Sequence, residues 1–169
     1  MKRLSDIVRL FVIVISISFI LTGCGMLPDS KTEKKFVGTW ESSWKDREDG
    51  VTMEFRETVI YKDDNTFKSK LNLTMTSPMY MPIVTVTYNG EWNATSSKLI
   101  GEIDKSTVEF NFSSSAKEMG ISGEMKSEFL SGLKESDYID GGKILEITEN
   151  LFKLEDEEDG TIYKYTRLN

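Results

Sequence analysis

The sequence contains no histidine, only one cysteine and only three prolines in 169 residues. Without histidine the chain has no Ser-His-Asp or Cys-His nucleophile and no histidine-based zinc, copper or haem site. A single cysteine allows no disulfide within the chain, so side-chain packing has to stabilise the fold. The segment 140–143 (Asp-Gly-Gly-Lys) lacks the glycine spacing of a phosphate-binding loop. These absences predict that the protein is not an enzyme and needs no cofactor or metal.

The first 23 residues have the pattern of an export signal. Lys2 and Arg3 provide positive charge, and residues 10–21 form an apolar run interrupted only by two serines. Twelve residues are too few for a comfortable bilayer span but suit the hydrophobic region of a signal peptide. The run ends at Leu21-Thr-Gly-Cys24. We therefore predict a cleavable signal peptide over residues 1–23.

The residues 21–24 resemble the lipobox of bacterial lipoproteins, in which small residues precede a cysteine that receives lipid. The resemblance implies a diacylglycerol thioether on Cys24, cleavage before it, and acylation (typically palmitate) of the new amino terminus. Two or more acyl chains anchor a protein stably, whereas one binds only marginally. Gly25 is not the aspartate associated with inner-membrane retention. The expected location is thus the outer membrane facing the periplasm in a Gram-negative host, and otherwise the outer face of the cytoplasmic membrane.

Charge restricts the partners of the mature chain. The whole sequence has a net charge of −7, and removal of three basic groups and one acidic group with residues 1–23 leaves −9. Such a surface is repelled by nucleic acid and by anionic headgroups. We therefore expect no nucleic-acid partner and a membrane attachment that depends on lipid.

The mature chain divides into a polar beginning and an alternating remainder. Residues 24–35 carry little apolar content after Leu27 and are predicted to be a flexible tether. From Phe36 to the end, apolar and polar residues alternate in several short runs, which is typical of half-buried antiparallel strands. Eight or nine strands are expected, forming one barrel domain over 36–169. Residues 122–133 break this rhythm with helical spacing, and Ser122 is the expected N-cap.

An ordered set of short motifs resembles the lipocalin-like domains of small bacterial lipoproteins. The first strand carries Gly38-Thr-Trp40 and the last ends at Arg167, with the predicted helix before the last three strands. The resemblance implies an all-β, mainly antiparallel, up-and-down barrel. It also implies that Arg167 covers Trp40 at the closed end by a cation–π contact, as a structural pair.

A ligand site is predicted around an apolar loop and the barrel interior. Residues 77–82 (Ser-Pro-Met-Tyr-Met-Pro) are apolar where a solvent-facing turn should be polar, and methionines suit irregular apolar surfaces. The alternative is that loop and helix pack on each other and plug the barrel. The candidate ligand-binding residues are Met79, Tyr80, Met81, Phe129, Phe55, Phe67 and Glu57.

Two acidic features have competing explanations. Glu57 is the one charge on the inward face of its strand, and a buried carboxylate needs a partner. It either orients a ligand's polar head, pairs with an inward Lys or Arg, or sits in water at the barrel mouth. The run 155–159 resembles a calcium loop, but the required twelfth-position glutamate is Thr166. It is therefore predicted to be a solvated hairpin tip.

The sequence leaves two functions open. In the first, a membrane-anchored barrel binds a small hydrophobic or amphipathic ligand such as a fatty acid or lipid fragment. In the second, a filled barrel presents its acidic rim or the 77–82 loop to an envelope protein and holds no small molecule.

Overall fold

The computed structural model describes residues 29–48, 51–76, 81–120, 123, 125–127, 130–131, 142–157 and 160–168. Within these residues, eight antiparallel strands form a closed barrel in which each strand pairs with the next along the chain. The lipocalin-like, up-and-down barrel predicted from the sequence is confirmed, at the lower of the two expected strand numbers. The elements are α2 (Ser30–Phe36), β1 (Gly38–Glu48), β2 (Val51–Tyr61), β3 (Thr66–Thr76), β4 (Ile83–Ala94), β5 (Lys98–Phe112), α3 (Ser114–Glu118), β6 (Gly142–Ile147), β7 (Leu151–Glu155) and β8 (Ile162–Arg167).

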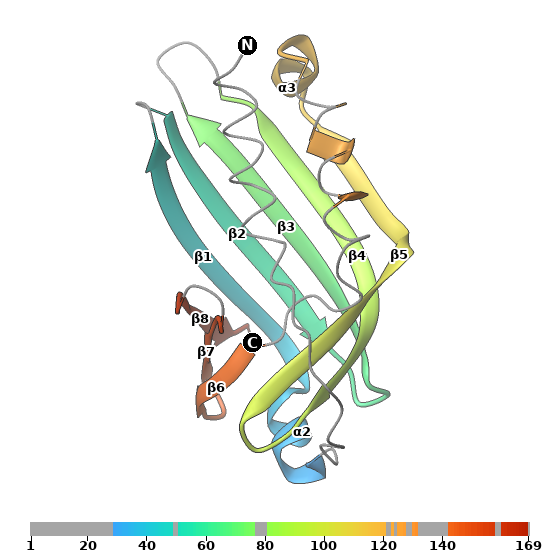
Figure 1. Ribbon diagram of the computed structural model, residues 1–169, viewed down its shortest axis with the longest axis vertical. Helices are drawn as coiled ribbons and strands as arrows, with labels where there is room; N and C mark the ends of the chain where they lie inside the picture. The colour runs from blue at the N-terminus through green and yellow to red at the C-terminus, as the bar shows by residue number, and fades with distance from the viewer. Residues whose placement is uncertain are drawn as a thin grey trace.

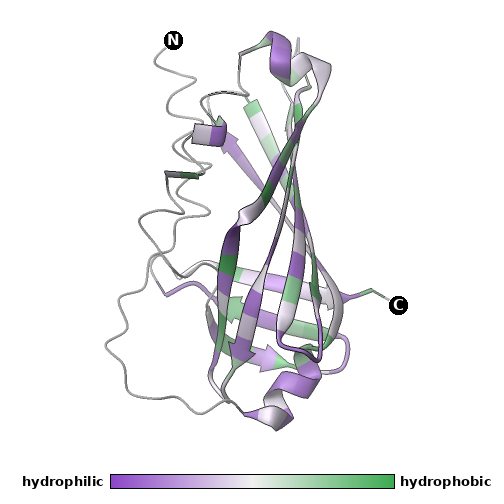
Figure 2. Ribbon diagram, turned by 90° about the vertical axis from the view of Figure 1, so that its right-hand side faces the viewer, coloured by the Kyte–Doolittle hydropathy of each residue, from purple (hydrophilic) through white to green (hydrophobic). Residues whose placement is uncertain are grey.

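The strands form because apolar side chains recur at every second position. Along β2, Met53, Phe55, Glu57 and Val59 are buried, while the residues between them are exposed or half-buried. Figure 2 shows this alternation of hydrophobic and hydrophilic residues along the long strands. Successive side chains of a strand point to opposite faces, so one set fills the barrel and the other meets water.

The barrel has two unequal halves (Figure 1). Strands β6, β7 and β8 are short, and among the described residues β6 pairs with β5 only at Lys98 and Leu99. In the same way β8 pairs with β1 only at Trp40 and Glu41. All eight strands therefore meet around one end, which we call the closed half. Strands β1 to β5 continue together beyond it. We call this continuation, from Glu57 toward the Glu48–Val51 end of the β1–β2 pair, the extended half.

The closed half is filled by aromatic rings. Phe152 lies 4.7 Å from Trp40, 5.0 Å from Phe36 and 4.4 Å from Tyr165 between ring centroids. Arg167 lies over the Trp40 ring, with its guanidinium carbon 4.1 Å from the ring centroid. This is the contact that the lipocalin resemblance led us to expect.

The prediction of a tether over 24–35 is wrong for its second part, since Ser30–Phe36 is the helix α2. Asp29 caps this helix by accepting hydrogen bonds from the Lys31 backbone N–H at 3.0 Å and the Thr32 hydroxyl at 2.6 Å. Phe36, expected to open the first strand, is instead the last helical residue and is fully buried. The described fold therefore includes residues 29–35, ahead of the predicted start of the barrel domain at residue 36. Residues 24–28 of the predicted tether lie outside the described residues.

Residues 123, 125–127 and 130–131 are helical and lie between β5 and β6 in the chain. They agree with the helix predicted over 122–133, ahead of the last three strands. Met125 is fully buried, and Leu130 packs against the core. The predicted N-cap, Ser122, lies outside the described residues.

Candidate functional site

A buried carboxylate stands at the boundary between the two halves. Glu57, on β2, is 4% exposed, and its Oε1 accepts hydrogen bonds from the Ser69 hydroxyl at 2.7 Å and the Tyr88 hydroxyl at 3.2 Å. Its Oε2 accepts one from the Tyr165 hydroxyl at 2.7 Å. The three donors come from β3, β4 and β8. We call these four residues the Glu57 cluster.

Within the part of the chain that the structure describes, two of the three predicted environments for the Glu57 carboxylate are not found. None of the ion pairs between described residues includes Glu57, so no inward Lys or Arg pairs with it there. Its burial also excludes a position in water at the barrel mouth. Glu57 needs no cation because hydroxyl groups satisfy its carboxylate, among them the Tyr165 hydroxyl that β8 brings to it. The third prediction, contact with a ligand's polar head, is not tested by the described residues.

The carboxylate retains acceptor capacity. An ionised carboxylate offers about four lone-pair positions, and three are used by the hydroxyl donors. The fourth position is not used by these donors. Chemically, the cluster presents carboxylate oxygens, which accept hydrogen bonds from donors such as hydroxyl or amino groups.

An apolar layer follows the Glu57 cluster in the extended half. Trp44 stacks on Phe55 with centroids 5.2 Å apart and an interplanar angle of 4°. Across the sheet, Phe110 and Phe112 stack at 5.8 Å. Buried aliphatic and thioether side chains fill the remainder of this layer: Met53, Leu71, Leu73, Met75, Val84, Val86 and Met125. The extended half thus combines flat rings with adaptable methionines.

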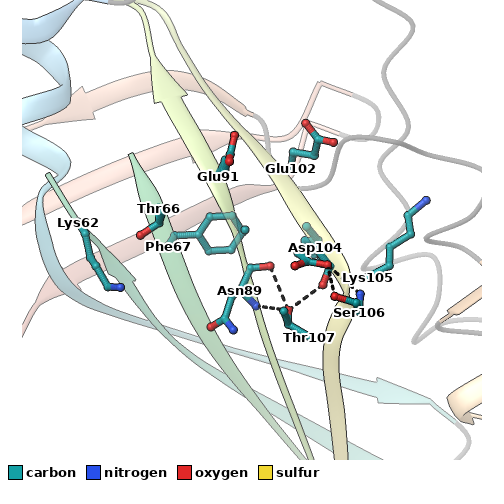
Figure 3. A pocket seen from close by; sticks show the side chains of 12 residues that line it. Lys62, Thr66, Phe67, Asn89, Glu91, Glu102, Asp104, Lys105, Ser106 and Thr107 are labelled. Atoms are coloured by element: carbon teal, nitrogen blue, oxygen red, sulfur yellow. Dashed lines mark hydrogen bonds between the residues drawn. The ribbon is translucent and has the colours of Figure 1, made fainter. Parts of the chain in front are cut away.

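A hollow of about 770 Å³ lies on the wall of the barrel, over β3, β4 and β5 (Figure 3). It exists because the β4–β5 register shifts between Thr87 and Asn89, where β5 turns outward. The Thr107 hydroxyl donates to the Asp104 carbonyl at 2.7 Å and accepts from the Asn89 N–H at 2.9 Å, which holds the turn. Most side chains around the hollow are polar or charged, of both signs.

The predicted ligand-binding residues separate into three groups. Phe55 and Phe67 are buried on the inner face with Glu57, and Phe67 also borders the wall hollow. Met81 is 57% exposed, and its carbonyl accepts a hydrogen bond from the Ser115 hydroxyl on α3, so it does not join the interior group. Met79, Tyr80 and Phe129 lie outside the described residues, as does Cys24.

Sequence reasoning missed the three hydroxyl donors of the Glu57 cluster. Ser69 carried a signal, since it is the one polar residue among the inward positions 67, 69, 71, 73 and 75 of β3. Tyr88 and Tyr165 occupy buried positions of their strands, where alternation alone treats them as apolar side chains. The signal for them is the inward charge of Glu57, because a buried carboxylate needs donors from neighbouring strands.

Comparisons with known proteins identify no relative: no protein-family model and no curated protein matches the chain. Within the described residues, no three acidic or cysteine side chains gather as a metal site would require. No helix among them combines the length and hydropathy that crossing a membrane requires.

Proposed function

We propose that this protein is an exported lipoprotein, anchored through lipid on Cys24, whose barrel binds a small hydrophobic or amphipathic molecule. The observation that carries the proposal is the layered interior, with the buried Glu57 cluster directly below the apolar layer of the extended half. Such an arrangement suits a molecule with one polar end and one apolar end. The protein binds its ligand without transforming it.

The position of Glu57 selects among ligands of this class. A ligand whose tail lies against Phe55 and Leu73 brings its head to the level of the carboxylate. A fatty acid places a second carboxylate there, and two like charges in a low-dielectric interior repel each other. An alcohol or an amine instead donates a hydrogen bond to the remaining acceptor position. We therefore expect neutral or cationic heads to be preferred over fatty acids.

The test uses three ligands with the same tail: dodecanol, dodecylamine and dodecanoate. The protein is the Cys24→Ser variant without residues 1–23, which removes the lipid anchor and makes the domain soluble. Isothermal titration calorimetry should show binding of the alcohol and the amine, and weaker binding of the acid. In the Glu57→Gln variant, the discrimination against the acid should shrink. The absence of any binding, together with no retained lipid in native mass spectrometry, would refute the proposed ligand function.

One observation favours a second candidate, a filled barrel that acts by contacting another envelope protein. Most inward side chains of the described strands are buried, with Trp44, Phe110 and Phe112 half-buried, and the hollow in Figure 3 lies on the outer wall. A photo-crosslinker at the exposed Met81, within the 77–82 loop, should then capture one defined protein in cells. The matched control is a crosslinker at Lys70, an exposed residue on β3. Equal, diffuse labelling from both positions contradicts this candidate.

A further inference from the structure

The helix α2 is fixed to the closed half at its beginning. The Asp29 backbone N–H donates to the Ala94 carbonyl at 2.9 Å, which ties the residue before the helix to the end of β4. One turn later, Glu33 Oε1 accepts a hydrogen bond from Asn65 in the β2–β3 turn at 3.3 Å. The first turn of α2 therefore has contacts to two separate turns at the closed end.

The end of the helix is held still more firmly. Arg167 donates to the Lys35 carbonyl at 2.8 Å and to the Val37 carbonyl at 2.7 Å. The Trp40 indole donates to the Phe36 carbonyl at 2.6 Å, and the Phe36 ring is fully buried. Swinging the helix away would expose Phe36 and break three hydrogen bonds. The helix is thus a rigid part of the closed end.

Chain length then limits where the lipid anchor attaches. Cys24 precedes Asp29 by five residues, and five residues reach at most about 18 Å when fully extended. The eleven residues of β2 span about 36 Å along the strand. Figure 1 shows α2 and α3 at opposite ends of the long strands. The anchor is therefore restricted to the neighbourhood of the closed end.

We infer that the closed end of the barrel faces the membrane and that the extended half points away from it. The inference rests on the proposed lipid anchor at Cys24, and it names the surface that meets the lipid. That surface consists of α2 and the β2–β3 and β4–β5 turns. Exposed charges of both signs lie on it, Lys31, Lys34 and Lys35 from α2 and Asp63 and Asp64 from the β2–β3 turn, so the lipid rather than the charge holds this surface at the membrane.

The orientation has a functional consequence. The extended half, the exposed Met81 and α3 lie at the end far from the lipid anchor. A ligand or a protein that binds at that end therefore approaches from the aqueous compartment rather than from the bilayer. A long flexible tether, as the sequence alone predicted, would have left no preferred orientation.

The experiment places a fluorophore at either end of the lipidated mature protein. Cys24 is the only cysteine and is blocked by lipid, so a cysteine introduced as Ser96→Cys or Lys117→Cys is the only free thiol. Both positions are exposed, in the β4–β5 turn and on α3. The labelled proteins are reconstituted into phosphatidylcholine–phosphatidylglycerol vesicles that contain headgroup-spin-labelled lipid. Quenching should be several-fold stronger at position 96 than at position 117.

Two further proteins carry a Gly/Ser insertion before Asp29, one in each labelled background. About ten such residues add a root-mean-square length of about 17 Å, which should reduce the difference between the two positions. Equal or reversed quenching in the short-tether proteins overturns the orientation while leaving the lipid anchor intact. Protein that does not bind the vesicles overturns the anchor, and the orientation with it.

Discussion

The two halves of the barrel share strands β1 to β5 but are packed with different side chains. In the closed half, Phe36, Trp40, Phe152 and Tyr165 meet edge-to-face or stacked at 4.4 to 5.0 Å. In the extended half, aliphatic and thioether groups surround fewer rings. Aromatic rings have few rotatable bonds and defined contact geometries, whereas methionine adapts to irregular space. The difference indicates that the closed half determines the shape of the barrel and that the extended half can adjust to what it contacts.

The first prediction compares a large side chain from each half. Trp40→Ala removes the contact with Phe152, the stack under Arg167 and the hydrogen bond to Phe36. It should lower the free energy of unfolding by about 4 kcal/mol in urea titrations. Phe55→Ala should cost less, about 3 kcal/mol, because neighbouring methionines can move into the space. Equal losses would remove the distinction between the halves.

The second prediction concerns Gly90, whose position on β4 admits no side chain. A Cβ there would lie 2.0 Å from the Glu102 carbonyl oxygen and 2.5 Å from the Phe67 ring. Because backbone cannot move aside cheaply, Gly90→Ala should destabilise the protein by about 3 kcal/mol.

The matched control is Gly123→Ala, at a helical position with nothing within 4 Å of the new Cβ. Alanine there should leave thermal stability unchanged or raise it slightly. If Gly90→Ala behaved like this control, the close approach of β3, β4 and β5 at Gly90 would be contradicted.

The third prediction tests the boundary between the halves. In Glu57→Gln, the amide nitrogen cannot accept a hydrogen bond, so at least one of the hydroxyl donors loses its acceptor. The free energy of unfolding should fall by about 2 kcal/mol, measured in urea. Tyr165→Phe, which removes a single donor, should cost about 1 kcal/mol. An unchanged stability in Glu57→Gln argues against the hydroxyl cluster.

The fourth and smallest effect concerns pH at the cap of α2. The Thr32 hydroxyl, followed by the Lys31 backbone N–H, lowers the pKa of Asp29 below its usual value of 3.8. Because the folded-state pKa is lowered, this stabilisation is complete above the unfolded pKa and is lost as the pH falls through the folded one.

Thermal unfolding of the wild type and of Asp29→Asn should reveal this contribution. Asparagine also caps helices but does not titrate. The variant should therefore lose less stability than the wild type on acidification below pH 3.8. Parallel curves for the two proteins would contradict the role of this carboxylate.

The sequence predicted the strands well where packing is periodic. Along β2 and β3 every second residue except Glu57 and Ser69 is large and apolar, and a period of two is a local property that needs no partner to be recognised. The helix α2 shows the opposite case. Its residues Ser-Lys-Thr-Glu-Lys-Lys have no apolar period, and only Asp29 and Phe36 marked its ends. Contacts with β4, the β2–β3 turn and Arg167 hold it in place, and these contacts are tertiary.

The sequence by itself determined the barrel, the inward direction of Glu57 and the pairing of Trp40 with Arg167. Alternation and short motifs are sufficient for these, because each depends on neighbouring residues or on one resemblance. Only the tertiary structure decided what surrounds Glu57, since its hydroxyl partners lie 12, 31 and 108 residues away in the chain. It also decided where β6 to β8 stop closing the barrel. Both depend on how distant strands cross, and no local pattern of side chains encodes a crossing.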